Sequence, residues 1–154
     1  LFLRQYMIDK LSTNELKSLC DSLLREFLIK KAEKNDFGRI FCPLEKRWLS
    51  EDKLHVCHII DRGKMITRFN PANVFLGSAN SNLFESKIMT KGYQSLHHKR
   101  IEDVFGEDLM IFLKELSEER KLYSREDYLD LITFFREEID GRDNRQYEVV
   151  EGEY

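Results

Sequence analysis

The sequence predicts an α+β protein that is predominantly helical, with a small strand–loop–strand–helix core between an N-terminal helix and a C-terminal helical subdomain. Three observations lead to this class. Apolar residues recur at three-and-four spacing near the N-terminus and again beyond residue 92, which is the period of one helix face. Two short apolar runs between these regions favour strands, and Gly, Pro and Asn separate them. The 154 residues are enough for one domain of ordinary size.

The N-terminal helical segment, residues 1–36, is built around a helix predicted over residues 13–34. Its apolar residues, from Leu16 to Leu28, fall on one face. Thr13 or Asn14 is expected to cap its first turn, and the turn-forming sequence "NDFG" ends it.

The core is predicted over residues 37–92. It begins with short strands and turns, and its clearest strand runs from about residue 53 to residue 60. A loop containing Gly63 and Asn-Pro leads to a second short strand, "NVFL", and then to a helix, "ANSNLFESKIM". The predicted order is therefore strand, loop, strand and helix.

Residues 93–141 are predicted to form helices that pack on this core. Ser124 and Asp127 have capping-box spacing before the last apolar stripe, and Gly141 ends it. Residues 142–154 form an acidic tail without periodicity, which is expected to be disordered.

Composition limits the class of protein. No apolar run approaches the roughly 20 residues that cross a bilayer, so no membrane segment is expected. The three cysteines form no Cys-x-x-Cys pair, which favours a reducing, cytoplasmic compartment over a disulfide framework.

Charge is unevenly distributed along the chain. Residues 55–100 contain seven Lys and Arg against two Asp and Glu, whereas residues 101–154 contain seven against 17. A basic central region on an acidic body suits a protein that binds a polyanion, although solvated helix faces also explain local charge runs.

Three polar residues stand at the ends of the predicted core elements. His58 ends the first strand, Asn73 opens the second strand 15 residues later, and Asn82 lies on the helix, 24 residues past His58. A neutral His can take a proton from water near neutral pH, and an amide oxygen suits a hard cation such as Mg²⁺ or Mn²⁺. For His58 alone, a structural role in the core is the alternative.

This order and spacing resemble the ββα-metal, or HNH (His-Me finger), nuclease motif. The flanks resemble the NinG/Rap recombination nucleases of lambdoid phages over about residues 20–106. The matching residues are His55, His58, Arg62-Gly63, Arg68-Phe69, Asn73, Ser78 to Asn82 and Tyr93 to Gly106. The resemblance implies that His58 activates water, that Asn73 bonds and holds the His58 ring, and that Asn82 binds one catalytic metal ion.

Two departures from the family pattern concern metals. The family's four zinc-binding cysteines fall at Cys42, Glu45, Ser78 and Ser81, so a structural zinc is not expected; the two serines are instead expected to cap the helix and bond turn amides. Cys57 stands where many HNH proteins have a metal-binding Asp, and a thiol is a poor ligand for Mg²⁺. A further metal ligand is therefore sought at His55, Asp61 or Glu85, with His55 preferred.

Arg62, Lys64 and Arg68 follow His58 in the predicted loop and are expected to contact DNA phosphates, ordinary loop charges being the alternative. The predicted function is a metal-dependent DNA endonuclease with a single-metal HNH mechanism, bacterial or phage-encoded. Its expected substrate is double-stranded or branched recombination DNA, and a homodimer is left open. The alternatives are an inactive HNH-like module that binds nucleic acid or a partner protein, and a restriction-type HNH endonuclease.

Overall fold

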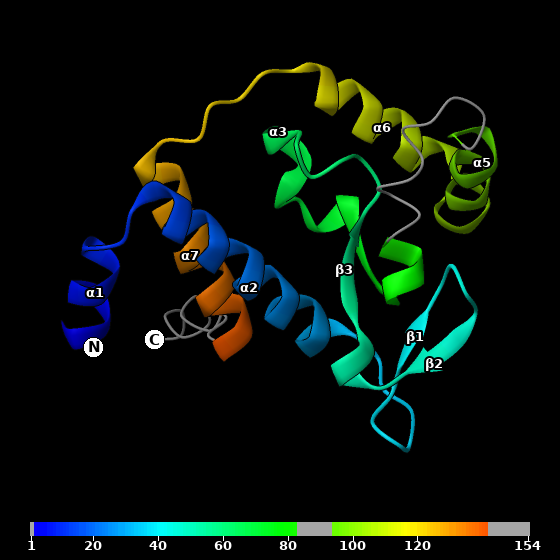
Figure 1. Ribbon diagram of the computed structural model, residues 1–154, viewed down its shortest axis with the longest axis horizontal. Helices are drawn as coiled ribbons and strands as arrows, with labels where there is room; N and C mark the ends of the chain where they lie inside the picture. The colour runs from blue at the N-terminus through cyan, green and yellow to red at the C-terminus, as the bar shows by residue number, and fades with distance from the viewer. Residues whose placement is uncertain (1, 83–93, 142–154) are drawn as a thin grey trace, which may run out of the picture. The chain divides into compact units, whose positions relative to one another are not determined.

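The computed structural model describes residues 2–82 and 94–141 (Figure 1). Helices dominate, and two small two-stranded antiparallel sheets lie between them in the sequence, which confirms the predicted class. Within these residues, none of the helices combines the length and apolar character needed to cross a bilayer. The predicted acidic tail and the second half of the predicted core helix lie outside the described residues.

The described residues form two compact units. One contains the chain up to Phe27 and from Ser124 onward, and the other contains Leu28–Tyr123. The predicted domain bounds remain a prediction, and by its contacts the last predicted helix belongs to the same unit as the N-terminal residues. An apolar stripe predicts that a helix has a buried face, but it does not identify the helix that covers that face.

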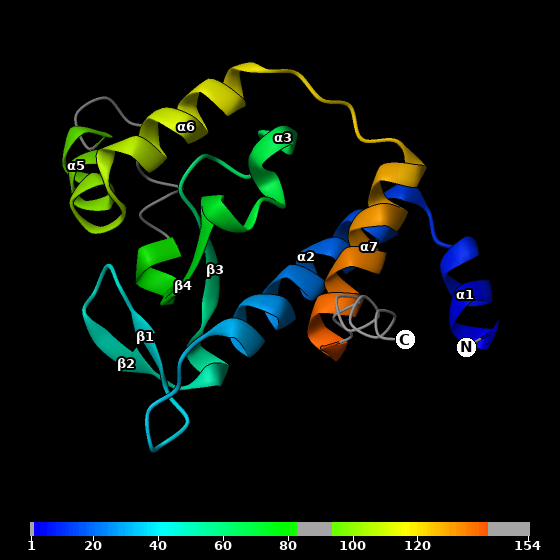
Figure 2. The ribbon, with the colours of Figure 1, turned by 180° about the vertical axis from the view of Figure 1, so that it is seen from behind.

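The described part of the first unit contains α1 (Phe2–Asp9), α7 (Arg125–Asp140) and α2 (Thr13–Lys31) as far as Phe27. Helices α2 and α7 lie side by side in both ribbon views (Figures 1 and 2). The ring of Phe27 packs against Phe134 and Phe135, at centroid distances of 6.2 and 5.6 Å. The buried residues of these two helices within the unit are Leu16, Cys20, Leu23, Leu24, Tyr128, Ile132 and Phe135.

The helix ends of this unit are closed by side chains. Ser12, one residue before the predicted caps of α2, exchanges hydrogen bonds with Glu15, and the predicted capping box of Ser124 and Asp127 opens α7. Arg125 donates to the carbonyls of residues 8, 9 and 11. A cation thus meets carbonyls at and just beyond the C-terminal end of α1.

The second unit contains both sheets. Strand β1 (Ile40–Cys42) pairs with β2 (Arg47–Leu49), and β3 (His55–His58) pairs with β4 (Val74–Gly77). The observed β3 is shorter than predicted because residues 51–53 form a 3₁₀ turn, η1 (Glu51–Lys53). Between β3 and β4 lie a short helix, α3 (Met65–Arg68), and a second 3₁₀ turn, η2 (Pro71–Asn73).

A helix begins immediately after β4, where residues 79–82 are helical. The order strand, loop, strand and helix is therefore present, as predicted. Two further helices, α5 (Gln94–Phe105) and α6 (Glu107–Glu118), pack in the same unit. The core of this unit is apolar, and its residues come from the end of α2, from the strands and their connections, and from α5 and α6. They are Ile29, Ile40, Cys42, Leu44, Leu49, Leu54, Cys57, Phe75, Leu76, Ile101 and Met110.

Candidate active site

His58 lies at the end of β3 and is buried, with 5% of its surface exposed. Its Nε2 atom is 3.0 Å from the backbone carbonyl oxygen of Arg68. A carbonyl oxygen only accepts hydrogen bonds, so Nε2 must hold the proton that is donated. In the neutral ring, Nδ1 is then the nitrogen with the lone pair, and this bond therefore selects the tautomer that has its basic nitrogen at Nδ1.

Asn73 fixes the loop that follows β3. Its Oδ1 accepts from the backbone nitrogen of Ile60 at 2.7 Å, and its Nδ2 donates to the carbonyls of Ile60 and Thr67, both at 3.1 Å. Its own carbonyl accepts from the nitrogen of Ile59 at 2.8 Å. The side chain is fully buried, so these bonds join both ends of the loop inside the protein, where hydrogen bonds are stronger than in water.

The role expected of Asn73 needs correction, because its side chain bonds backbone groups and not the imidazole of His58. Both amide hydrogens are used by carbonyls, which leaves none for the ring. Asn73 acts one step further away. It holds Thr67, the neighbour of the residue whose carbonyl accepts the proton of His58.

Arg68 also differs from the prediction. Its side chain is buried, and one guanidinium nitrogen donates to the carbonyl of Arg62 at 3.0 Å. We therefore withdraw it as an exposed phosphate contact and assign it to loop structure, since a buried guanidinium is held by the carbonyls around it. Arg62 and Lys64 are exposed on the same loop, where a DNA phosphate could reach them.

His55 does not join this site. It is the first residue of β3 and is exposed, and it stands three positions from His58. Side chains alternate along a strand, so residues three apart point to opposite faces. The structure thus separates His55 from His58, and we withdraw it as a ligand of a metal beside His58. Cys57 is fully buried in the core and is excluded as a ligand for the same cation.

The described residues do not build a metal site around His58. In residues 2–82 and 94–141, no three His, Cys, Asp or Glu side chains cluster in a metal-binding arrangement. Asn82 is half-buried in the helical turn after β4, where its nitrogen bonds the carbonyl of Ser78. Asp61 is exposed, with its Oδ1 accepting from the nitrogen of Gly63. Glu85 lies outside the described residues.

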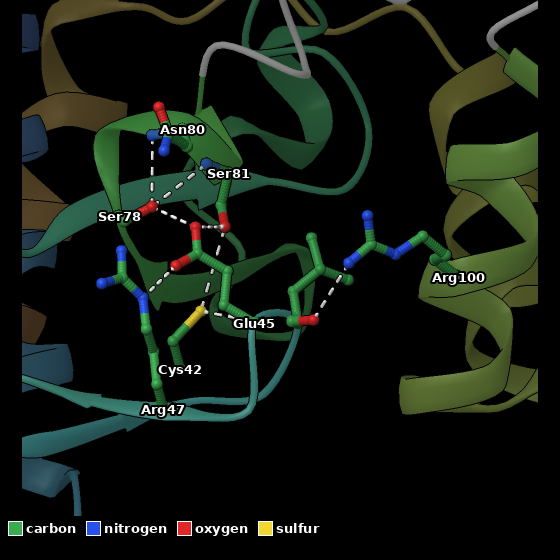
Figure 3. A network of polar contacts seen from close by, with 8 residues as sticks. Cys42, Glu45, Arg47, Ser78, Asn80, Ser81 and Arg100 are labelled. Atoms are coloured by element: carbon green, nitrogen blue, oxygen red, sulfur yellow. Dashed lines mark hydrogen bonds and ion pairs between the residues drawn. The ribbon is translucent and has the colours of Figure 1, made fainter.

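A second polar cluster lies on the core side of the two sheets, and Figure 3 shows its members turned toward one another. The carboxylate of Glu45 accepts from the hydroxyls of Ser78 and Ser81, the latter at 2.9 Å. Cys42 Sγ accepts from the nitrogen of Glu45 at 3.5 Å and lies 3.9 Å from the Ser81 hydroxyl. These four residues, Cys42, Glu45, Ser78 and Ser81, are called the polar knuckle below.

The polar knuckle joins the β1–β2 turn to the start of the helix after β4. As predicted, Ser78 caps that helix, since its hydroxyl accepts from the nitrogens of Asn80 and Ser81. The Nε atom of Arg47 donates to the other oxygen of Glu45 at 2.5 Å. On the far side of the turn, Arg100 of α5 donates to the carbonyl of Leu44 at 3.3 Å (Figure 3).

The knuckle has an anion at its centre. Burial raises the pKa of Glu45, but the hydrogen bonds from Ser78, Arg47 and Ser81 and the charge of Arg47 outweigh it, so this pKa lies below its ordinary value. Glu45 is therefore ionised at neutral pH. The four positions that the family resemblance assigns to zinc ligands thus lie close together. The carboxylate of Glu45 connects them by accepting hydrogen bonds from the two serine hydroxyls.

Sequence reasoning missed two of these contacts. The carbonyl of Arg68 as the partner of His58 has no side-chain signal, because any residue could supply it. Glu45 as the acceptor for both serines does have one, since "CPLE" and "SANS" place polar groups at the same three-residue spacing. No family model, curated protein or solved structure matches this chain significantly.

Proposed function

We propose that the chain is a DNA endonuclease of the ββα-metal type, in which His58 is the general base. The observation that supports this most is the fixed tautomer of His58 within a strand–loop–strand–helix unit. The Nε2–H group is committed to the carbonyl of Arg68, and Asn73 pins the loop that presents this carbonyl. A base that is already held by a backbone group loses little conformational entropy when it takes its position for the reaction.

The proposed reaction is the hydrolysis of one phosphodiester bond. Nδ1 of neutral His58 accepts a proton from water, the water oxygen forms a bond to phosphorus, and the bond from phosphorus to the leaving oxygen breaks. The leaving oxygen takes its proton from solvent. Arg62 and Lys64 position the DNA through its phosphates, which would make binding independent of base sequence.

We propose Mg²⁺ or Mn²⁺ as the cofactor, which would neutralise charge at the phosphate. Asn82 lies within the described residues and has a suitable ligand atom, an amide oxygen. Since one neutral ligand does not make a site, we assign no step of the reaction to the metal. The substrate class is proposed as double-stranded or branched DNA, on the family resemblance alone.

A catalytically inactive module that binds nucleic acid is the second candidate. One observation favours it, namely that the position of the usual acidic ligand is occupied by Cys57, whose thiol is fully buried. This candidate keeps the loop cations and the fold but predicts no cleavage under any metal condition.

One experiment separates these two functions. Linear, supercoiled and four-way-junction DNA are incubated with the protein in Mg²⁺, Mn²⁺ or EDTA. We expect cleavage with a divalent ion and none in EDTA. The variant His58→Gln retains an amide N–H that can donate to the carbonyl of Arg68, but it has no basic nitrogen. It should cleave about 10²-fold to 10⁴-fold more slowly with unchanged DNA affinity.

The matched control is His55→Ala, which removes the other histidine of the same strand from the opposite face. It should cleave at the wild-type rate. If His58→Gln is folded and fully active, His58 is not the base and the proposal is wrong. If no DNA is cut while DNA binds, the inactive module is the better description.

A further inference from the structure

The outward face of the β1–β2 hairpin presents two aromatic side chains. Phe41 and Trp48 are cross-strand partners, and their ring centroids are 5.3 Å apart at an interplanar angle of 60°. Their exposed fractions are 42% and 44%, whereas the strand neighbours Ile40 and Leu49 are buried. The alternation that buries the inner face of the hairpin thus leaves this aromatic pair on the outer face.

The aromatic pair borders a groove. The groove is also lined by Ile40 and by Ala32 and Glu33, which directly follow the C-terminal end of α2. The volume of the groove is about 480 Å³, which is within the range of sites for small ligands. A planar group can therefore enter beside the rings, rather than only touch their edges.

Cations are frequent in the segment that forms this face. Between Lys30 and Leu49 the chain contains six Lys and Arg against three Asp and Glu, in a protein whose net charge is −3. Lys34, Arg39 and Lys46 are exposed; Arg39 directly precedes β1, and Lys46 lies in the turn between β1 and β2. This arrangement of aromatic rings among cations complements a planar base with a phosphate on each side.

We propose that the outward face of the β1–β2 hairpin binds unpaired nucleotides, with bases stacking on Phe41 and Trp48 and phosphates contacting Arg39 and Lys46. Bases in a duplex already stack on one another and cannot offer their faces, so the surface should select single-stranded segments. This inference rests on the proposed function and specifies its substrate class as DNA that contains unpaired nucleotides.

Glu33 is the anionic exception in the groove. Its carboxylate can accept hydrogen bonds from the amino groups of cytosine or adenine, which thymine lacks. It would repel a phosphate, so the phosphate path is assigned to Arg39 and Lys46 and not to the part of the groove that Glu33 lines.

The test uses the intrinsic fluorescence of Trp48, the single tryptophan of the chain. Full-length protein is titrated in EDTA with an oligonucleotide of about 12 nucleotides and with a duplex of the same sequence. Stacking on the indole should quench its emission with the single strand, and the duplex should bind at least about tenfold more weakly.

Variants assign the effect to the rings. Phe41→Leu keeps the apolar volume and the reporter but removes one stacking ring, and it should weaken single-strand binding about tenfold. Trp48→Tyr, followed by the anisotropy of a labelled oligonucleotide, should preserve binding, whereas Trp48→Leu should lose about tenfold. The matched control is Phe112→Leu, which removes an exposed Phe on α6 of the same unit and should leave affinity unchanged. Urea unfolding of each variant confirms that it is folded.

Equal binding of single strand and duplex, or unchanged affinity in folded Phe41→Leu and Trp48→Leu, would overturn the inference. Concentration-dependent self-association that requires Trp48, without quenching by DNA, would overturn it as well and would assign the face to a second copy of the chain. The proposed nuclease activity is tested separately, by DNA cleavage. Cleavage that depends on His58 without quenching refutes the hairpin surface alone, and quenching without cleavage supports the surface while refuting the nuclease.

Discussion

Replacement of Glu45 by Gln tests whether a carboxylate holds the polar knuckle together. Glu45 accepts from two serine hydroxyls and from Arg47. In the variant, the amide oxygen can still accept from the serines, but without charge, and the amide nitrogen then faces the Nε–H of Arg47, so two donors meet. Hydrogen bonds to charged groups contribute about 1.5–3 kcal/mol each and neutral ones about 0.5–1.5 kcal/mol.

The expected loss is therefore about 1 kcal/mol for each serine contact. The side chain of Arg47 is 56% exposed, so its ion pair with Glu45 contributes less than about 1 kcal/mol. We expect Glu45→Gln to lower the free energy of unfolding by about 2 kcal/mol at neutral pH. Glu45→Ala should cost more, since both hydroxyls then lose their acceptor.

The pH dependence follows from the lowered pKa of Glu45. A carboxyl whose pKa is lower in the folded protein stabilises the fold above the unfolded pKa, and that stabilisation disappears as the pH falls through the folded pKa. The difference between wild type and Glu45→Gln should thus be full at pH 7. It should begin to shrink below about pH 4.5, the ordinary value for Glu.

Urea unfolding followed by Trp48 fluorescence measures this difference in the unit that contains the knuckle. Glu115→Gln, which removes an exposed carboxylate in the middle of α6, is the matched control and should unfold like wild type. Equal urea midpoints for Glu45→Gln and wild type would refute the reasoning. A difference that stays constant down to pH 3 would show that the charge of Glu45 is not responsible.

Two further predictions concern the loop after β3. Asn73→Ala should lower the free energy of unfolding by about 3 kcal/mol, because it removes three hydrogen bonds to backbone groups of Ile60 and Thr67, each worth about 1 kcal/mol; thermal unfolding checks this, and a melting temperature unchanged from wild type would contradict it. Arg62→Ala and Lys64→Ala should each weaken DNA binding equally for all sequences and reduce the slope of log affinity against log salt by about one. A loss confined to one sequence, measured by anisotropy, would indicate base contacts instead.

Periodicity and spacing predicted the elements of this protein better than its contacts. The helix stripe beginning at Leu16 and the capping box at Ser124 depend on neighbours in the sequence, so both could be found there. Spacing also placed Asn73 beside the strand that ends in His58. These side chains bond backbone carbonyls. Every residue has a carbonyl, so residue types alone do not indicate which one is the partner.

Arg68 shows a second reason for failure. A cation in a loop is usually solvated, and the sequence offered no sign that this guanidinium is buried and bonds the carbonyl of Arg62. The ring of the adjacent Phe69 is also buried and packs against Tyr123, at a centroid distance of 5.8 Å. Tyr123 is more than fifty residues away in the chain, so this burial is a tertiary effect that local patterns cannot predict.

The polar knuckle makes chelators informative reagents for this protein. When cysteines bound to a metal close such a junction, EDTA both removes the cation and unfolds the domain, so any loss of function has two explanations. Here the junction is closed by hydrogen bonds from the hydroxyls of Ser78 and Ser81 to the carboxylate of Glu45. We therefore expect a chelator to leave this junction closed, so that loss of the proposed DNA cleavage in EDTA would report on the chemistry and not on an opened junction.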